Sequence, residues 1–215
     1  MVNEENFSTD KKTGPLIGVG PCPEPWPEGD WFDPELLLEG DKRNVIDRYR
    51  YWTVEAIVSD LDKRRHSFHI AVENWDHDLN IGTVVRNANA FLASGVHIVG
   101  KRRWNRRGAM VTDRYQHVTY HPTIEEMLIW ADSKKLPLIG IDNLPDSSPL
   151  ESAVLPKECV LLFGQEGPGL SDLAQQVCKV VYSISQYGST RSINAGVASG
   201  IAMHTWIRQH AGISS

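Results

Sequence analysis

In the second part of the chain, two patterns of apolar and polar residues alternate. Short apolar runs alternate with longer segments in which apolar residues recur every three or four positions. The first pattern is typical of buried strands and the second of amphipathic helices. The predicted strands cover residues 68–72, 96–99, 138–141, 160–163 and 180–184, and the predicted helices lie near residues 80–94, 123–135, 170–178 and 192–209.

This alternation predicts one α/β domain over residues 63–211, followed by a short tail at residues 212–215. Strands that alternate with helices usually form a mostly parallel sheet with helices on both faces. The pattern does not determine the order of the strands in that sheet.

Residues 1–62 have a different character and are predicted to be an acidic N-terminal extension. The first 40 residues are polar or rich in proline and glycine, so we expect coil there, although Trp26, Trp31 and Phe32 can anchor it. Apolar residues at helical spacing then predict a helix over residues 41–62. These residues are Val45, Tyr49, Trp52, Ala56 and Ile57.

The net charge of -5 is unevenly distributed along the chain. Residues 1–62 carry fourteen acidic and six basic residues, which leaves thirteen acidic and sixteen basic residues (27 less 14, and 22 less 6) for the remainder. Two basic clusters stand out in that remainder, at residues 63–66 and 101–107. Phosphate binding depends on the local density of cations, so the negative total does not exclude a nucleic-acid partner.

The cysteines and the hydropathy pattern indicate a cytoplasmic protein. Cys22, Cys159 and Cys178 are widely spaced and contain no CxxC pair, which favours reduced thiols over disulfides or a zinc site. No apolar run approaches the length of a membrane span, and the first residues lack the apolar run of a signal peptide. Residues 76–78 (Asp-His-Asp) have no second ligand cluster, so we expect a polar loop and no metal.

The first motif with candidate chemistry is Asn80-Ile81-Gly82-Thr83-Val84-Val85-Arg86. It follows a predicted strand and a polar loop. Asn80 is predicted to cap the next helix, and Arg86 lies nearly two turns further along, within reach of a ligand at the strand ends. Arg86 is equally compatible with a surface cation on an amphipathic helix.

The second motif, residues 161–171, reads Leu-Leu-Phe-Gly-Gln-Glu-Gly-Pro-Gly-Leu-Ser. A buried strand runs into a loop with three glycines, and Ser171 is the predicted N-cap of the following helix. Glycines allow backbone groups to approach a ligand closely, although a simple strand-to-helix turn has the same composition. Glu166 favours a site, because a carboxylate is costly to bury without a partner.

The third motif, residues 183–195, reads Ser-Ile-Ser-Gln-Tyr-Gly-Ser-Thr-Arg-Ser-Ile-Asn-Ala. A strand ends, a polar loop follows, and Ser192 or Asn194 begins the last helix. The first turns of that helix contain mostly small residues. Such residues favour close packing against another segment, either around a ligand or simply within the core. They are Ala195, Gly196, Ala198, Ser199, Gly200 and Ala202.

Taken together, the three motifs resemble those of the SPOUT methyltransferases, in the SpoU/TrmH branch. The family patterns are N-x-G-x-x-x-R, F-G-x-E-x-x-G-L and S-[LI]-N, and the resemblance covers residues 66–210. Residues 186–188 (Gln-Tyr-Gly) stand where relatives often have a proline, and residues 1–62 have no counterpart. The matching residues are Asn80, Gly82, Arg86, Phe163, Gly164, Glu166, Gly169, Leu170, Ser192, Ile193 and Asn194.

The resemblance implies an α/β fold whose C-terminal segment threads a deep trefoil knot, a rare exception to the usual topology. It also implies a homodimer with the active site near the interface, and S-adenosylmethionine bound bent at the second and third motifs. The implied cofactor-binding residues are Leu162, Phe163, Gly164, Glu166, Gly167, Gly169, Ile184, Gln186, Ser192, Ile193 and Asn194.

The resemblance further implies methyl transfer to a ribose 2′-hydroxyl of tRNA or rRNA, with Arg86, Glu166, Ser192 and Asn194 as catalytic residues. Arg86 is a poor base, so we expect it to hold the 3′ phosphate and the emerging alkoxide. Glu166 is expected to fix the second motif or to pair with Arg86 or Arg191. Within residues 101–107, Trp104 can stack on a base. A run of solvated charges without a function would have the same sequence. The expected RNA-binding residues are Asn80, Arg86, Lys101, Arg102, Arg103, Trp104, Arg106 and Arg107.

Two alternative functions remain open, and a third is disfavoured by the sequence. An RNA-binding protein of the same fold that has lost turnover, and an enzyme that methylates a base nitrogen, are both compatible with the fold. A nucleotide-linked oxidoreductase would require G-x-G-x-x-G after the first strand and an acidic residue about 20 positions further on. Residues 80–82 (Asn-Ile-Gly) do not supply that pattern.

Overall fold

The computed structural model describes residues 18–76 and 78–212 of the 215-residue chain. The chain divides into two compact units, Met1–Ile57 and Val58–Ser215. The division falls inside a helix, whereas the sequence pattern suggested a boundary after residue 62. Residues 1–17 of the expected coil and residues 213–215 of the expected tail lie outside the described residues.

The smaller unit contains a helix where coil was expected. Helix α1 (Pro34–Glu39) begins after Asp33, whose side chain accepts hydrogen bonds from the backbone N–H groups of Glu35 and Leu36. Proline is favoured at the first helical position because its missing N–H has no helical partner there. Of the three aromatic residues expected to anchor this unit, two make ring contacts: the ring of Trp31 lies 5.7 Å from that of Phe32 and 6.2 Å from that of Trp52.

The helix predicted over residues 41–62 is present only in its last part. This part is the helix α2 (Val54–Asp62), and the 3₁₀ turn η1 (Asp47–Tyr49) precedes it. The fully buried carboxylate of Asp41 accepts hydrogen bonds from the guanidinium and backbone N–H of Arg43 and from the N–H of Tyr51. These hydrogen bonds fold the chain back on itself before α2 begins. The apolar residues that precede α2 at helical spacing therefore lie in a loop and not on one face of a helix.

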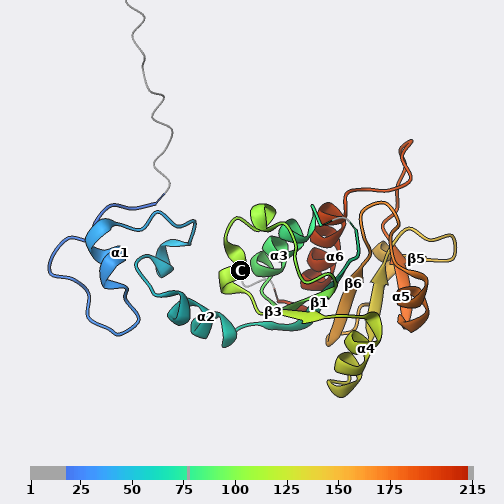
Figure 1. Cartoon of the computed structure of the whole chain (residues 1–215), viewed down its shortest axis with the longest axis horizontal. Helices are drawn as coiled ribbons and strands as arrows, with labels where there is room; N and C mark the ends of the chain where they lie inside the picture. The colour runs from blue at the N-terminus through green and yellow to red at the C-terminus, as the bar shows by residue number, and fades with distance from the viewer. Residues whose placement is uncertain (1–17, 77, 213–215) are drawn as a thin grey trace, which may run out of the picture. The chain divides into compact units, whose positions relative to one another are not determined.

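The larger unit is built on a seven-stranded sheet in which every pair of neighbours is parallel (Figure 1). The strand order is β3-β2-β1-β6-β4-β7-β5. All five predicted strands are present. The strands are β1 (His66–Asn74), β2 (Ala93–Gly100), β3 (Val118–His121), β4 (Leu138–Ile141), β5 (Ser148–Pro149), β6 (Cys159–Phe163) and β7 (Val180–Ser183).

The helices cover both faces of the sheet, as predicted. The helices α3 (Ile81–Ala90) and α6 (Ala195–His210) contribute to one hydrophobic cluster, and α4 (Ile124–Ser133) and α5 (Asp172–Val177) contribute to a second. Within the first cluster the ring of Trp206 lies 4.4 Å from that of Phe68. The connections include three short 3₁₀ turns, η2 (Arg106–Ala109), η3 (Thr112–Tyr115) and η4 (Leu150–Ser152).

The cysteines form no disulfide bonds. Cys22, Cys159 and Cys178 are free. No helix in the described part of the chain is long and apolar enough to cross a membrane. Nor does the described part hold three or more His, Cys, Asp or Glu side chains placed to bind a metal ion; His77 of the Asp-His-Asp loop lies outside it.

Three histidines form a hydrogen-bonded row across β1, β2 and β3. The Nδ1 of His69 lies 3.1 Å from the Nε2 of His97, and the Nδ1 of His97 lies 2.8 Å from the Nε2 of His121. The indole of Trp130 on α4 packs over His97, with ring centroids 4.0 Å apart. Burial lowers the pKa of His97 to about 2 and that of His69 to about 4, the latter assisted by the nearby Lys134.

These pKa values predict a loss of stability in mild acid. Unfolded histidines bind protons near pH 6.5, whereas His69 and His97 stay neutral in the folded protein, so the unfolded state is favoured as the pH falls below 6.5. We expect the free energy of unfolding to decrease by about 2–4 kcal/mol between pH 7 and pH 5. Urea denaturation at both pH values measures this decrease. The variant His97→Gln should show a smaller decrease, whereas a change at the exposed His204, His204→Gln, should leave the decrease as in the wild type. An unchanged decrease in His97→Gln would contradict the role of His97 in this pH dependence.

Candidate functional site

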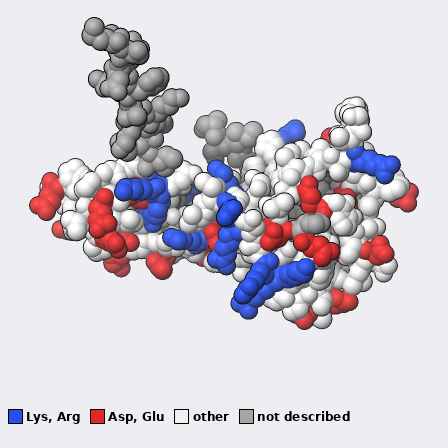
Figure 2. Space-filling view, turned by 45° about the horizontal axis from the view of Figure 1, so that its top comes forward, with Lys and Arg blue, Asp and Glu red and all other residues white. Residues whose placement is uncertain are grey.

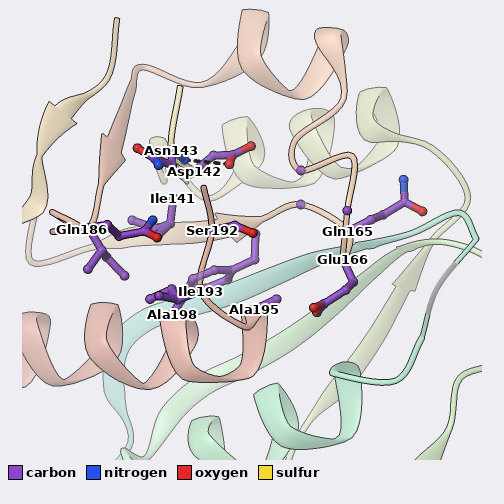
Figure 3. A pocket seen from close by; sticks show the side chains of 15 residues that line it. Ile141, Asp142, Asn143, Gln165, Glu166, Gln186, Ser192, Ile193, Ala195 and Ala198 are labelled. Atoms are coloured by element: carbon purple, nitrogen blue, oxygen red, sulfur yellow. Dashed lines mark hydrogen bonds between the residues drawn. The ribbon is translucent and has the colours of Figure 1, made fainter. Parts of the chain in front are cut away.

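A pocket lies where the segments that follow β6, β4 and β7 meet the first turns of α6 (Figure 3). These strands are neighbours, and the carboxyl ends of parallel strands form the edge at which open α/β sheets usually bind ligands. Leu162 is buried within the sheet and Asn194 stands at the start of α6, so neither lines the pocket. Nine of the expected cofactor contacts do line it: Phe163, Gly164, Glu166, Gly167, Gly169, Ile184, Gln186, Ser192 and Ile193.

The second motif forms a tight backbone loop. Gln165 and Gly169 exchange two backbone hydrogen bonds, of 3.0 and 3.1 Å. A Cβ atom on Gly164 would lie 2.0 Å from the carbonyl carbon of Gly169. Gly167 and Gly169 have φ angles of +92° and +75°, a region that favours glycine. The glycines are therefore required by the path of the loop itself.

A buried carboxylate holds this loop against β1. Glu73 is fully buried and accepts hydrogen bonds from the backbone N–H of Ser171 (2.8 Å), from the Ser171 hydroxyl (2.7 Å) and from the Trp75 indole N–H (2.9 Å). The side-chain oxygen of Gln165 accepts from the backbone N–H groups of Trp75 and Asp76. Ser171 also caps α5, as predicted. The loop is thus anchored from both of its ends.

The loop of the third motif is anchored in a similar way. The carboxylate of Glu151 accepts hydrogen bonds from the backbone N–H and the hydroxyl of Ser185, at 2.9 and 3.0 Å. The amide of Asn143 donates to the backbone carbonyl of Arg191 at 2.8 Å. Glu151 and Asn143 were not predicted from the sequence. The position of Asn143 two residues after a buried strand was the available signal, because strand ends place such residues at the pocket.

A chain of side-chain hydrogen bonds joins the three motifs. The amide of Asn194 donates to the side-chain oxygen of Asn80 at 2.8 Å, and the amide of Asn80 donates to the carboxylate of Glu166. The side-chain oxygen of Asn194 caps α6 by accepting from the N–H groups of Gly196 and Val197. Segments more than 80 residues apart in the sequence therefore meet at one point beside the pocket.

One expectation about these residues was wrong, and one of the two roles expected for Glu166 is not seen. Asn80 precedes α3 but its side chain makes no capping hydrogen bond, because its amide is engaged by Asn194 and Glu166. The contact of Asn80 with RNA stays a prediction. Among the described residues Glu166 forms no ion pair with Arg86 or Arg191, and its partner is Asn80.

Small residues allow α3 and α6 to pack closely, as their density in the sequence predicted. A Cβ atom on Gly196 would lie 2.7 Å from the methyl group of Thr83 on α3. The amide of Asn87 donates to the carbonyl of Gly196 at 2.8 Å. The first turn of α6, which forms one wall of the pocket, is fixed by these contacts.

Arg86 lies on the exposed side of α3 and does not line the pocket. Its neighbours Val84 and Val85 are completely buried in the core. Within residues 18–76 and 78–212, Arg86 has no hydrogen bond or ion pair. Its guanidinium is therefore available to a molecule outside this chain.

The basic segment 101–107 follows β2 and is largely exposed. The amide of Asn74 donates to the backbone carbonyls of Lys101 and Arg103, which fixes the start of the segment. Trp104 is half-buried, packs against the core and lies under the guanidinium of Arg106, so it is less accessible for base stacking than expected. On the face drawn in Figure 2, Lys and Arg side chains gather in groups.

Comparisons with known proteins match the same part of the chain. The model of the SpoU rRNA methylase family matches residues 67–204, more than half of the chain. A protein of Mycobacterium avium (strain 104), named as an uncharacterized tRNA/rRNA methyltransferase, is 33% identical over 150 residues, which are 66% of this chain and 48% of the relative. The chain thus spans about half the length of the curated relatives that it matches.

Two solved structures have the same fold. The SpoU methyltransferase AviRb from Streptomyces viridochromogenes, in complex with the cofactor AdoMet, aligns with a TM-score of 0.61 and 23% identity over 70% of this chain and 60% of its own. A structure described as an RNA 2′-O ribose methyltransferase aligns with a TM-score of 0.59 and 20% identity, covering 66% of this chain and 55% of its own.

Proposed function

The chain belongs to the SpoU methylase family of SPOUT methyltransferases, and on this premise we propose that it transfers a methyl group from S-adenosylmethionine to a ribose 2′-hydroxyl of tRNA or rRNA. The observation that carries the proposal is the hydrogen-bonded link of Asn80, Glu166 and Asn194 beside the pocket. It brings the three family motifs to one site. The presence of AdoMet in AviRb supports the choice of cofactor.

The residues of the pocket fit a bent S-adenosylmethionine. Apolar side chains from three strand ends offer a surface for the adenine ring, and the backbone of the glycine loop leaves room for close approach. The Oε1 atom of Gln186 is buried and has no hydrogen-bond partner among the described residues, so it can accept from an N–H group of the ligand. The apolar residues are Ile141, Phe163, Ile184 and Ile193.

In the proposed reaction the sulfonium supplies an activated methyl group, and the protein positions the acceptor. The ribose oxygen must approach in line with the methyl carbon while negative charge develops on that oxygen. Ser192 lines the pocket, and Asn194, held by Asn80, fixes the helix start beside it. Arg86 holds the adjacent phosphate and stabilises the oxygen as its proton leaves to water, because a guanidinium stays charged and donates hydrogen bonds.

The proposal includes a homodimer and the C-terminal trefoil knot of this family. Val197 and Ile201 on α6 expose 55% and 39% of their surfaces and lie one turn apart on the same side of the helix. A second subunit on this face would cover them. It would also bring a second chain close to the start of α6, so the exposed Arg86 acts either on the site of its own chain or on that of the partner. Mass photometry tests the dimer.

The proposed function is tested by two measurements. Calorimetry should detect binding of S-adenosylhomocysteine to the purified protein. Bulk tRNA and rRNA are then methylated with labelled cofactor and digested with alkali, which cannot cleave next to a 2′-O-methyl group. Label in alkali-resistant dinucleotides supports the proposal. Label in mononucleotides indicates base methylation, and cofactor or RNA binding without transfer indicates an inactive relative.

Neutralising the basic segment is expected to weaken RNA binding selectively. Replacing Arg102, Arg103, Arg106 and Arg107 with glutamine removes up to four phosphate contacts. The plot of log K for RNA binding against log salt concentration has a negative slope, and its magnitude should fall by about 2–3. Affinity for S-adenosylhomocysteine should not change, because none of these residues lines the pocket. Filter binding at several salt concentrations measures the slope. Loss of cofactor binding would mean that the segment is structural.

A further inference from the structure

Tyr187 is the most exposed large apolar side chain in the described part of the chain, with 97% of its surface accessible. A single exposed aromatic residue needs no explanation on most surfaces. This one, however, lies on the loop of the third motif. Ile184 and Gln186 before it and Ser192 and Ile193 after it all line the pocket. Tyr187 therefore belongs to a loop whose two ends line the pocket of the proposed active site.

The loop is held at its ends and unsupported at its tip. Glu151 binds Ser185 on one side, and Asn143 binds the carbonyl of Arg191 on the other. Between these anchors, residues 187–190 form no hydrogen bond with other described residues. A Cβ atom on Gly188 would have no atom within 4 Å. The tip is thus presented at a fixed place without being packed against the protein.

The composition of the tip matches the requirements of an unpaired RNA strand. Residues 187–191 offer an aromatic ring with its phenolic hydroxyl, two aliphatic hydroxyl groups and a guanidinium, and all five residues are exposed. Proteins recognise single-stranded RNA by stacking bases on aromatic side chains and by contacting phosphates and 2′-hydroxyl groups. A base inside a duplex already stacks on its neighbours and offers no face to such a ring.

We propose that this tip is an RNA-binding subsite in which Tyr187 stacks on an unpaired base beside the methylated nucleotide and Arg191 contacts a neighbouring phosphate. The inference rests on the proposed function and makes it more specific. The substrate is then an RNA loop or bulge, and a continuous duplex is not methylated.

The test uses the full chain saturated with S-adenosylhomocysteine, and two RNA probes. One is a hairpin with 5-iodouridine in its loop, and the other is a blunt duplex of the same composition. Tyr187→Ala should weaken hairpin binding by about 5- to 100-fold, the range measured for loss of one stacked base. Tyr187→Phe, which keeps the ring, should bind like the wild type. Photocrosslinking of the wild type should place the iodouridine on the peptide that contains Tyr187.

A matched control is Ile129→Ala, which removes an apolar side chain, 69% exposed, from α4; its hairpin affinity should not change. The inference is overturned if Tyr187→Ala binds and methylates RNA like the wild type, if it loses cofactor binding, or if it changes the oligomeric state, which would indicate a protein contact. Failure of the proposed function is distinguishable, because the wild type itself would then not bind cofactor or transfer methyl groups.

Discussion

Replacing Arg86 with alanine is expected to lower the rate of methyl transfer by on the order of 10²- to 10³-fold, the loss typical for a group that stabilises developing oxyanion charge. Arg86→Lys should recover little of this rate, because lysine keeps the charge but lacks the planar fork that binds phosphate through two hydrogen bonds. Affinity for S-adenosylhomocysteine should be unchanged in both variants, because Arg86 is exposed and does not line the pocket. Single-turnover assays at saturating cofactor measure the rate.

The control is Arg114→Lys, a change of the same kind at another exposed arginine, which should leave the rate unaltered. Near-normal turnover in Arg86→Lys would contradict the geometric role of the guanidinium. Mixed dimers test whether Arg86 acts across the interface. If it does, a dimer of one Arg86→Ala subunit and one subunit with a disabled pocket contains one complete site and regains activity. If it acts within its own chain, neither site is complete.

The central elements of the fold were predictable because they are buried on both sides. The runs around Ile70, Ile98, Ile139 and Leu161 are almost inaccessible to solvent, so each strand is continuously apolar in the sequence. The edge strands β3 and β5 were missed for the opposite reason. The first three residues of β3 are exposed, and β5 contains two exposed residues. Neither leaves an apolar run to detect.

The smaller unit shows where spacing alone misleads. Tyr49 and Ile57 are buried and were placed on one helical face, but a turn around the buried Asp41 separates them. A carboxylate that bends the chain by accepting from Arg43 and Tyr51 has no local sequence signature. Its partners are identifiable only once the chain is folded.

In the candidate site, too, local features were predictable and contacts between distant residues were not. Pocket residues such as Gly164 and Ser192 belong to short motifs, in which the order of residues encodes the local backbone path. The residues that hold these motifs in place act over long separations. Glu73 binds Ser171, 98 positions away, and Glu151 binds Ser185, 34 positions away. A single sequence contains no record of such pairs, so they became visible only in the structure.

Gly164→Ala is expected to abolish cofactor binding, with a loss of more than about 100-fold in affinity and about 2–4 kcal/mol in stability. The new methyl group would lie 2.0 Å from the carbonyl carbon of Gly169 and 2.1 Å from the nitrogen of Leu170. These are backbone atoms, so no side chain can rotate to make room. They are also held in place, because Gly169 exchanges two hydrogen bonds with Gln165 and Leu170 donates to Asp142.

Relief of this clash requires the glycine loop to open, which breaks the wall against which the cofactor is proposed to lie. Gly188→Ala is the matched control, since it adds the same methyl group to the neighbouring loop where no atom lies within 4 Å. It should bind S-adenosylhomocysteine and unfold like the wild type. Calorimetry and urea denaturation of both variants separate the two effects. A Gly164→Ala protein with normal cofactor affinity would show that the ligand does not rest on this loop, because the loop cannot keep its path around the added atom.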